Sequence, residues 1–301
     1  MVEKRCVKLL VLGARGQVGW ELTRTLAPLG EVSALDRSAL DATDLSAVRS
    51  TVRSLEPDII VNAAAYTNVD GAETESALAR RLNAQMPRAL GEEAERRGAL
   101  LIHYSTDYVF DGTSDRPYVE ADQPHPTNEY GRSKLEGDLG ILGTEAHAYI
   151  FRIGWVYALR GHNFVATIQR LARERDELRV VGDQYGSPTW ARVIAGATSL
   201  AINRWLTARR DVAEAPPRGV YHMAAPDSAS WHDFASAIVA SMPAAQGWRR
   251  PPVRSITTAE YPTAALRPAR TVLDSGKLRD EFGLGLPPWR AQFSLCMDAR
   301  P

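Results

Sequence analysis

Apolar runs and amphipathic stretches alternate along the first half of the chain. Each apolar run is almost continuous and is bounded by turn residues, a pattern typical of strands buried on both faces of a sheet. The expected strands occupy 7–13, 31–36, 59–66, 99–110 and 148–157. Helical spacing of apolar residues lies between them, at 17–30, 43–57, 74–98 and from residue 128 onward.

Local signals mark the ends of these helices. Gly30 ends the first, Thr43 or Asp44 is the expected N-cap of the second, Pro57 closes it, and Pro87 interrupts the third. Repeated strand–helix units need crossover connections, which give a parallel sheet with helices on both faces. The sequence therefore predicts an α/β fold built on a Rossmann-type, doubly wound parallel sheet.

Regularity falls after residue 157. Residues 180–190 form a loop rich in Gly and Pro, 208–219 are typical of an exposed connection, and 247–270 contain too much proline for a long helix or a central strand. We expect a smaller, irregular C-terminal domain over the carboxyl edge of the sheet. The expected division gives a dinucleotide-binding domain at 1–155 plus roughly 190–214, and a substrate-binding domain at roughly 156–189 and 215–301.

Charge and composition exclude several classes of protein. The 301 residues include 36 basic and 36 acidic side chains, which removes the positive surface expected of a nucleic-acid binder. No stretch approaches the ~18 apolar residues of a membrane span. Cys6 and Cys296 lie at opposite ends of the chain, outside any metal-binding spacing, and this fits a reducing cytoplasm. We expect a cytoplasmic protein without a nucleic-acid or membrane partner.

The segment GARGQVG places glycines at 13, 16 and 19, after the first strand and at the start of the first helix. In this context Gly13 allows a tight turn, Gly16 lets the backbone approach a pyrophosphate, and Gly19 lets the helix pack against the strand. The helix N-terminus then offers free N–H groups to phosphates. The spacing is G-x-x-G-x-x-G, so a purely structural turn is the alternative to a dinucleotide site.

Residues at the end of the second strand bear on the choice of cofactor. Asp36 is placed to accept hydrogen bonds from ribose hydroxyls, which favours NADH. Arg37, and Arg15 in the glycine turn, are candidates for a 2′-phosphate, which favours NADPH. Each arginine has solvent exposure as its alternative, so either NADPH or NADH remains a candidate.

Tyr130 and Lys134 are four residues apart, on one face of an expected helix. Lysine is rare in this chain, with four among the 36 basic residues, and about 0.13 such pairs are expected by chance at this composition. A free phenol has a pKa of about 10, and a nearby ammonium lowers it. The pair therefore predicts a proton donor and its partner, with an exposed helix pair as the alternative.

Two hydroxyl side chains, Ser105 and Thr106, end the fourth expected strand. Doubly wound folds bind ligands at this edge, where a hydroxyl can hydrogen-bond a carbonyl and the alkoxide formed from it. A capping hydroxyl is the alternative reading.

Six motifs together resemble one family. GARGQVGWEL, NAAAYTNVD, YSTDYVFDG, YGRSKLEGD, RIGWVY and DQYGSPT are similar to the extended short-chain dehydrogenase/reductase superfamily and, within it, to the dTDP-4-dehydrorhamnose reductase (RmlD) family. The resemblance covers nearly the whole chain. It implies an NAD(P)H-dependent reduction of the 4-keto group of dTDP-4-dehydro-L-rhamnose to dTDP-L-rhamnose, in nucleotide-sugar biosynthesis.

The resemblance also implies roles for individual residues. The catalytic residues would be Thr106, Tyr130 and Lys134. Residues implied to bind the cofactor are Gly13, Arg15, Gly16, Gln17, Val18, Asp36, Arg37, Asp44, Leu45, Ala65, Tyr66, Thr67, Tyr130 and Lys134, with Asp44 and Leu45 near the adenine. Residues implied to contact the sugar nucleotide are Thr106, Asp107 and Trp155.

The chain also departs from the family pattern. Gly154 stands where Ser is common, and Tyr66 where some relatives have His. Some relatives are dimers bridged by carboxylate-bound Mg²⁺, whereas here Arg192 lies near a position that would need an acid. The histidines show no ligand spacing, and we expect no metal site and a monomer or weak homodimer. Trp231 and Trp289 are expected to be packing residues.

Two other functions stay open. One is a non-catalytic, dinucleotide-binding regulatory subunit of the same fold, against which the Tyr130–Lys134 pair argues. The other is a reductase of a different nucleotide 4-ketosugar.

Overall fold

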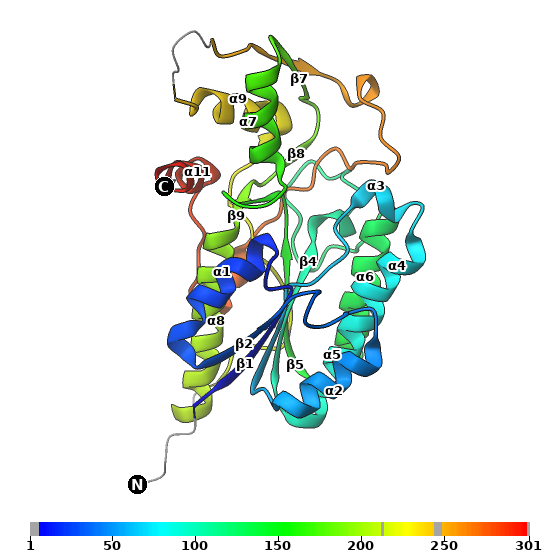
Figure 1. The fold of residues 1–301 in the computed structure, drawn as a ribbon, viewed down its shortest axis with the longest axis vertical. Coiled ribbons are helices and arrows are strands. Elements are labelled where there is room, and N and C mark those ends of the chain that lie inside the picture. Colours follow the sequence, from blue (N-terminus) through cyan, green and yellow to red (C-terminus); the bar gives the residue numbers. More distant parts are fainter. Residues whose placement is uncertain (1–5, 212–213, 244–248, 300–301) are drawn as a thin grey trace.

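A parallel sheet forms the centre of the protein. The computed structural model describes residues 6–211, 214–243 and 249–299. The 6-stranded sheet has the order β10-β5-β4-β3-β1-β2, and every neighbouring pair is parallel (Figure 1). The strand order reverses at β1, since β2 lies on one side of it and β3 to β5 lie on the other, and this makes the sheet doubly wound. The strands are β1 (Lys8–Leu12), β2 (Glu31–Leu35), β3 (Ile59–Asn62), β4 (Leu100–Thr106), β5 (His147–Ile153) and β10 (Gly219–His222).

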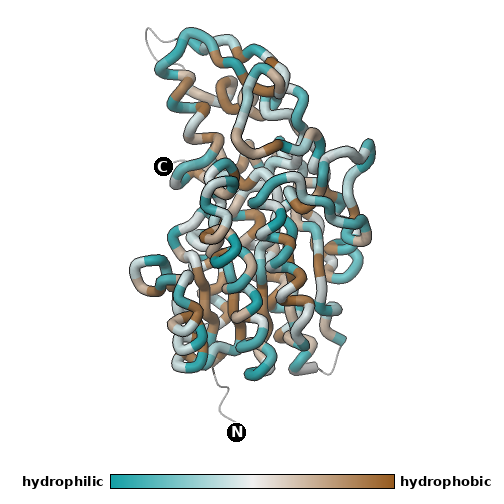
Figure 2. The backbone as a smooth tube through the Cα atoms, turned by 90° about the vertical axis from the view of Figure 1, so that its right-hand side faces the viewer, coloured by the Kyte–Doolittle hydropathy of each residue, from teal (hydrophilic) through white to brown (hydrophobic). Residues whose placement is uncertain are grey.

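Helices cover both faces of the sheet. One face packs against α1 (Gln17–Thr25) and α8 (Ala191–Asp211). The other packs against α2 (Leu45–Leu55), α5 (Met86–Arg97) and α6 (Glu129–Leu142). Figure 2, viewed from the side of α6, shows hydrophobic and hydrophilic residues alternating along the chain there. The predicted α/β fold with a doubly wound parallel sheet is confirmed.

The side chains of neighbouring residues in one strand pack on opposite faces of the sheet. Leu9 and Val11 of β1 pack in the cluster that contains Leu22 of α1, whereas Leu10 packs in the cluster that contains Val48 of α2. This two-residue period explains why the strands read as continuous apolar runs. Burial of one such side chain contributes on the order of 2 kcal/mol.

Of the predicted helix ends, those at Asp44 and Pro57 are confirmed and those at Gly30 and Pro87 are wrong. The first helix ends at Thr25, and Gly30 instead follows a separate 3-10 turn, Ala27–Leu29. Asp44 caps α2 by accepting hydrogen bonds from the next turn, and Glu56 ends it with a left-handed φ of 49°. The predicted third helix continues through Pro87, because α4 (Ser76–Arg80) runs through a π-helical turn, η2 (Arg81–Gln85), into α5. Since proline has no N–H, the carbonyl of Asn83 is left without its usual helical donor and lies against α6. A Cβ on Gly137 would come within 2.0 Å of that oxygen, so glycine permits this close approach.

Several predicted boundaries were wrong. The strands expected at 59–66 and 99–110 end earlier, at Asn62 and Thr106. The strand expected at 148–157 ends at Ile153, because Trp155 has a φ of 46° and turns the chain away from the sheet. The connection expected at 208–219 starts late, since α8 continues to Asp211 and residues 212–213 lie outside the described part. The end of that region, from Gly219, is strand β10 of the main sheet, which the sequence did not predict and which the expected division had placed in the substrate-binding part.

Apart from the core on the two faces of the sheet, the protein has a second hydrophobic cluster. The elements that carry it, among them α7 and α9, lie beyond the carboxyl ends of the strands (Figure 1). Tyr157, Phe234, Trp289 and Phe293 are buried at its centre, which confirms Trp289 as a packing residue. Short strand pairs frame it, including β7 with β12, in which Leu178 is opposite Val253. The elements of this region are β6 (Val156–Tyr157), α7 (Phe164–Glu174), β7 (Leu178–Val181), β8 (Tyr185–Gly186), β9 (Thr189–Trp190), β11 (Ala229–Ser230), α9 (Trp231–Ala240), β12 (Val253–Ile256), η4 (Thr258–Glu260) and α11 (Trp289–Asp298).

The remaining elements are short. They are η1 (Ala27–Leu29), α3 (Val69–Ala72), η3 (Asp107–Val109) and α10 (Gly276–Phe282).

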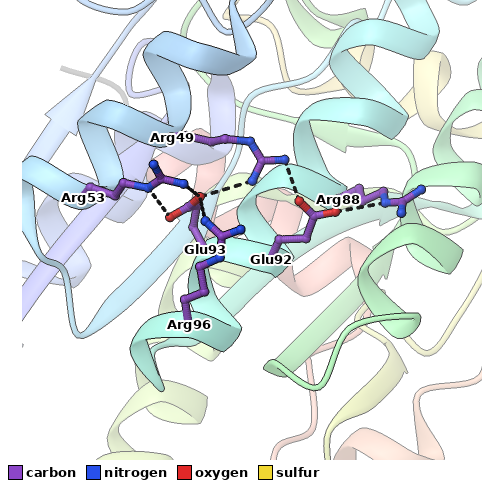
Figure 3. A network of polar contacts seen from close by, with 6 residues as sticks. All are labelled: Arg49, Arg53, Arg88, Glu92, Glu93 and Arg96. Carbon is purple, nitrogen blue, oxygen red and sulfur yellow. Dashed lines mark hydrogen bonds and ion pairs between the residues drawn. The ribbon is translucent and has the colours of Figure 1, made fainter.

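Ion pairs join α2 to α5 on the outer face of the sheet (Figure 3). Glu93 is 1% exposed and accepts hydrogen bonds from Arg53 at 2.7 and 2.9 Å. Arg49 and Arg96 each donate to the same carboxylate at 3.2 Å, and Arg49 also donates to Glu92 at 2.6 Å. The hydrogen bond from Arg53 is the main reason why the pKa of Glu93 lies below its usual value.

Candidate active site

A cavity of ≈ 550 Å³ opens at the carboxyl ends of β1, β3, β4 and β5. Four separate segments of the chain supply its walls: the glycine turn with α1, the segment after β3, the end of β4 with α6, and the segment after β5. The lining residues are Arg15, Gly16, Gln17, Val18, Trp20, Ala63, Ala65, Thr67, Tyr104, Ser105, Thr106, Asp107, Tyr130, Lys134, Ile153, Gly154, Trp155, Val156, Arg160, Gly161 and His162.

The glycine turn has the geometry that the sequence predicted. Gly13 has a φ of 78°, and a Cβ there would lie 2.7 Å from the backbone of Ala63. A Cβ on Gly19 would lie 2.1 Å from the carbonyl oxygen of Gly13, so only glycine allows α1 to approach the turn. Gly16 is the N-cap of α1 and provides no side-chain cap, which leaves the first N–H groups of the helix available to an anion.

Asp36 lies at the end of β2, where it is paired with Arg15. The Nε of Arg15 is 2.5 Å from one carboxylate oxygen of Asp36. Ser38 donates to the other oxygen from its backbone and its hydroxyl, and these hydrogen bonds are the largest cause of the lowered pKa of Asp36. Arg37 is exposed. Of these residues only Arg15 lines the cavity.

Besides Gly13, Asp36 and Arg37, three further residues assigned to the cofactor by resemblance lie outside the cavity lining. Asp44 uses its carboxylate to cap α2, and Leu45 packs against the hydrophobic cluster on that face of the sheet. The hydroxyl of Tyr66 donates to Glu75, which is the main cause of the raised pKa of Tyr66. Its neighbours Ala65 and Thr67 do line the cavity.

Tyr130 projects into the cavity from the first turn of α6. Asn128 caps this helix by accepting a hydrogen bond from the N–H of Gly131. Burial raises the pKa of Tyr130 to about 12, and a hydrogen bond with Thr106 opposes that rise. The ring also meets Tyr108 edge to face, with 6.0 Å between ring centroids. Since its pKa lies far above neutrality, the phenol keeps its proton at physiological pH.

Lys134 lies one turn further along α6 and is 1% exposed. Its Nζ donates to the carbonyl oxygen of Tyr104 at 2.5 Å and lies 3.3 Å from Nε2 of His103. Burial lowers the pKa of Lys134 to about 8, while the charge of Asp138 raises it. The expected lowering of the Tyr130 pKa by this lysine is absent, because burial dominates and Lys134 is not among the groups that shift it.

Thr106 and Asp107 follow at the end of β4. The Thr106 hydroxyl donates to Oδ1 of Asp107 at 3.1 Å and accepts from the N–H of Tyr108 at 3.2 Å. The hydroxyl of Thr271 donates to Oδ2 of Asp107 at 2.5 Å, across 164 residues of chain. Burial raises the pKa of Asp107 to about 6. The neighbouring hydroxyl of Ser105 instead donates to Asp138 at 2.8 Å.

Trp155 forms a wall of the cavity in a left-handed backbone conformation. Its indole stacks on Trp231 with ring centroids 3.4 Å apart and planes 4° apart. Gly186 lies against the edge of the indole, where a Cβ would approach Nε1 to 2.2 Å. Trp231 in turn packs on Phe164. The expectation that Trp231 is a packing residue was therefore incomplete, since it supports a residue of the cavity wall.

The loop before α7 adds cavity residues that the sequence reading missed. Arg160 lies over one side of the Trp20 ring at 3.1 Å, and Arg24 lies at 3.4 Å from the same ring. Asn163 holds the loop by donating to the carbonyl oxygens of Ala158 and Arg160 at 2.8 and 3.0 Å. Nothing in the local sequence indicated this contact, because it depends on the approach of the loop to α1.

The described residues were also compared with the requirements of a metal site. Within 6–211, 214–243 and 249–299, no group of three or more His, Cys, Asp or Glu side chains is arranged to hold a metal ion. Arg192 pairs with Glu21 at 3.0 Å, between α8 and α1.

No helix in the described part of the chain is both long and apolar enough to cross a bilayer.

Known proteins resemble the chain over almost its whole length. A family model described as the RmlD substrate binding domain matches residues 7–300. The dTDP-4-dehydrorhamnose reductase of Burkholderia thailandensis is 47% identical over 295 residues, covering 97% of this chain and 98% of that protein. The Escherichia coli K12 protein of the same name is 43% identical over 293 residues, covering 94% and 95%.

A solved structure supports the same relationship. The dTDP-4-dehydrorhamnose reductase of Bacillus anthracis in complex with NADP has a TM-score of 0.86 and 33% identity, covering 98% of this chain and 100% of that one. Sequence motifs, fold and these comparisons agree, and the chain belongs to the RmlD family, the family of the dTDP-4-dehydrorhamnose reductases.

Proposed function

We propose that this chain reduces the 4-keto group of dTDP-4-dehydrorhamnose to give dTDP-rhamnose, with NADPH or NADH as the reductant. The observation that carries the proposal is the meeting of Thr106, Tyr130 and Lys134 with an uncapped, glycine-lined helix N-terminus in one cavity. The names and near-complete coverage of the relatives support the choice of substrate.

The residues around the glycine turn suit a dinucleotide. Gly13, Gly16 and Gly19 leave room for a close backbone approach, and the N-terminus of α1 favours a negative charge. The side-chain oxygen of Gln17, a cavity residue, is buried without a partner and remains available for a hydrogen bond. These residues would hold the pyrophosphate, Asp36 and Arg15 would contact the adenosine ribose, and Ala65 and Thr67 would line the path to the nicotinamide. When bound, the reduced nicotinamide supplies the hydride.

Tyr130 acts as the proton donor in this proposal. Its raised pKa keeps the phenol protonated, and the proton passes to the oxygen of the substrate carbonyl as negative charge develops there. Thr106 orients that carbonyl when its single hydroxyl proton, which is donated to Asp107 in the free protein, turns to the same oxygen. Lys134 holds the nicotinamide ribose from the neighbouring turn of α6. Much of the rate enhancement then comes from alignment in the cavity.

The sugar nucleotide would lie between the end of β4 and the second hydrophobic cluster, against Asp107 and Trp155. We retain the division into a dinucleotide-binding part and a substrate-binding part, with β10 moved to the former because it pairs with β5. We also propose a cytoplasmic protein that is a monomer or weak homodimer. The pairing of Arg192 with Glu21 supports the absence of a metal-bridged dimer, since the family resemblance implies that such a bridge needs an acid near position 192.

Turnover of purified protein with a panel of dTDP- and UDP-4-ketosugars tests the proposal. We expect oxidation of NADPH or NADH with dTDP-4-dehydrorhamnose, and formation of dTDP-rhamnose identified by comparison with authentic product. Preference for another ketosugar would replace the substrate and keep the reaction class. Cofactor binding without turnover of any ketosugar would favour a regulatory subunit.

A further inference from the structure

Two buried polar side chains, those of Asn62 and His103, form a row of contacts that ends at Lys134. Asn62 ends β3 and is 1% exposed, and His103 lies beside it on β4 and is 0% exposed. The amide nitrogen of Asn62 is 3.0 Å from Nδ1 of His103, and Nε2 of the same ring is 3.3 Å from Nζ of Lys134. The proposed catalysis uses neither Asn62 nor His103.

The contacts of Asn62 determine which nitrogen of His103 carries the proton. The N–H of Ala64 donates to Oδ1 of Asn62 at 3.2 Å, so the amide oxygen faces Ala64 and the NH₂ group faces the imidazole. Nδ1 of His103 must then accept. Complete burial and the nearby lysine hold the pKa of His103 well below its usual range, so the ring is neutral and its single proton lies on Nε2.

This tautomer directs a donor at the lysine nitrogen. An Nε2–H group repels an ammonium and donates to a neutral amine, so the imidazole favours the deprotonated form of Lys134. The carbonyl oxygen of Tyr104 accepts from the same nitrogen and fixes its position.

We propose that Asn62 and His103 are a positioning pair that locks the Nε2–H tautomer against Lys134, placing its nitrogen and weakening its hold on a proton. The inference rests on the proposed function only in treating Lys134 as part of the active site. A lysine that releases its proton readily can restore the proton that Tyr130 gives to the product oxygen.

Other charged and titratable groups face Lys134 and act on the same equilibrium. Asp138, one turn further along α6, favours the ammonium. Arg152 of β5 lies 3.4 Å from that carboxylate and offsets part of its charge. Tyr130, on the preceding turn, is neutral at physiological pH because of its raised pKa. Asp138 favours the protonated form of Lys134. The imidazole of His103 is the neighbour that contacts the lysine nitrogen directly and favours the deprotonated form.

The first test is the tautomer itself, in the wild-type protein. Nitrogen NMR of histidine-labelled protein at neutral pH should show His103 with an unprotonated Nδ1 and a protonated Nε2. A proton on Nδ1, or on both nitrogens, would overturn the proposal. This readout needs no substrate, so it remains informative even if the proposed reaction is wrong.

The second test reverses the tautomer with an isosteric change. In Asn62→Asp a carboxylate replaces the amide, so Nδ1 becomes the donor and Nε2 becomes an acceptor for the ammonium. We expect the titration midpoint of Lys134, followed by NMR of labelled lysine, to rise by about one pH unit or more. The falling limb of the kcat profile at alkaline pH should move upward by the same amount.

Two controls separate the tautomer from added charge. Asn62→Asp combined with His103→Phe keeps the new carboxylate and removes the imidazole. The rise of the Lys134 midpoint in this double variant, relative to His103→Phe, should be smaller than the rise in Asn62→Asp relative to wild type. Asn68→Asp adds a carboxylate at the exposed cap of α3 and should leave the Lys134 midpoint unchanged. Equal shifts with and without His103 would mean that the imidazole transmits nothing, and the proposal would fail.

Discussion

Trp155 and Trp231 form a stacked pair of indoles, with 3.4 Å between ring centroids, although 75 residues of chain separate them. One member lines the cavity, and the other joins it to Phe164 in the second hydrophobic cluster. The stack supports a side chain whose backbone, at a φ of 46°, adopts a conformation that is costly for a non-glycine residue.

Trp231→Ala should therefore act through Trp155. An aromatic pair is worth about 0.5–1.5 kcal/mol beyond burial, so we expect KM for the sugar nucleotide to rise about two- to tenfold. The cofactor Kd should stay the same, because Trp231 does not line the cavity near the glycine turn. Trp231→Phe should recover most of the loss. A fall in Tm with unchanged KM would show that the stack is only structural.

Tyr130→Phe keeps the ring and removes the hydroxyl. Fold and cofactor affinity should survive, while kcat falls by about 10²–10⁴, the usual range for losing a positioned acid. Stopped-flow measurement of a single turnover would report the chemical step directly. A variant that retained wild-type kcat would exclude Tyr130 as the proton donor.

Lys134→Arg keeps the charge and changes its shape. Nζ fits between the Tyr104 carbonyl and His103 in a site that is almost fully buried, and a planar guanidinium is too wide for it. We expect both kcat and cofactor affinity to fall, measured by steady-state kinetics and by titration of nucleotide binding. Activity near that of wild type would mean that charge alone suffices.

Arg15 of the glycine turn and Arg37, which follows β2, offer a matched pair of substitutions for testing cofactor preference. Arg15 contacts Asp36 and lines the cavity, whereas Arg37 is exposed. Arg15→Ala should weaken NADPH binding about tenfold, the worth of a charge-assisted hydrogen bond of about 1.5 kcal/mol, and leave NADH binding nearly unchanged. Arg37→Ala should have the smaller effect. Calorimetry with both cofactors checks this, and equal losses for NADPH and NADH would show that neither arginine reads the 2′-phosphate.

Glu93→Gln should destabilise the protein in a pH-dependent way. The arginines around Glu93 lower its pKa from the ordinary value of 4.5, so its charge contributes stability above that value and loses it as the pH falls through the lowered pKa. At neutral pH we expect a cost of about 1–3 kcal/mol from the weakened hydrogen bonds. Urea unfolding at several pH values should show the difference from wild type shrinking below about pH 4.

An exposed glutamate serves as the control for that measurement. Glu174 pairs with Arg170 one turn away on the surface of α7. Glu174→Gln should cost less than about 0.5 kcal/mol. If both variants lost a similar free energy of unfolding, the buried network around Glu93 would stabilise the protein no more than an exposed ion pair does.

Local sequence signals predicted much of this molecule. The three glycines at 13, 16 and 19, and the four-residue spacing of Tyr130 and Lys134, each depend on one turn or one helix, which a short stretch of sequence determines. For the same reason Asp44 was one of the two expected N-caps of the second helix, and it is the residue that caps α2.

Features that depend on distant contacts escaped prediction. The stack of Trp231 on Trp155, the approach of Arg160 to Trp20, and the contact of His103 with Lys134 each join segments that meet only in the folded chain. Strand β10 has 4 residues, and its sequence is too short to show a periodicity. The pKa of Tyr130 was predicted with the wrong sign, because burial raises it and only the hydrogen bond with Thr106 opposes that rise.

The hydrogen bond from Thr271 to Asp107 has a consequence for the synthesis of the protein. The cavity wall at the end of β4 is complete only when a hydroxyl 164 residues further along the chain reaches it. A nascent chain on the ribosome can thus form β1, α1 and the glycine turn early, yet it lacks a finished substrate site until its last part has emerged. Nucleotide affinity should precede catalytic competence during translation, so a chain that stalls before residue 271 would sequester cofactor without consuming it.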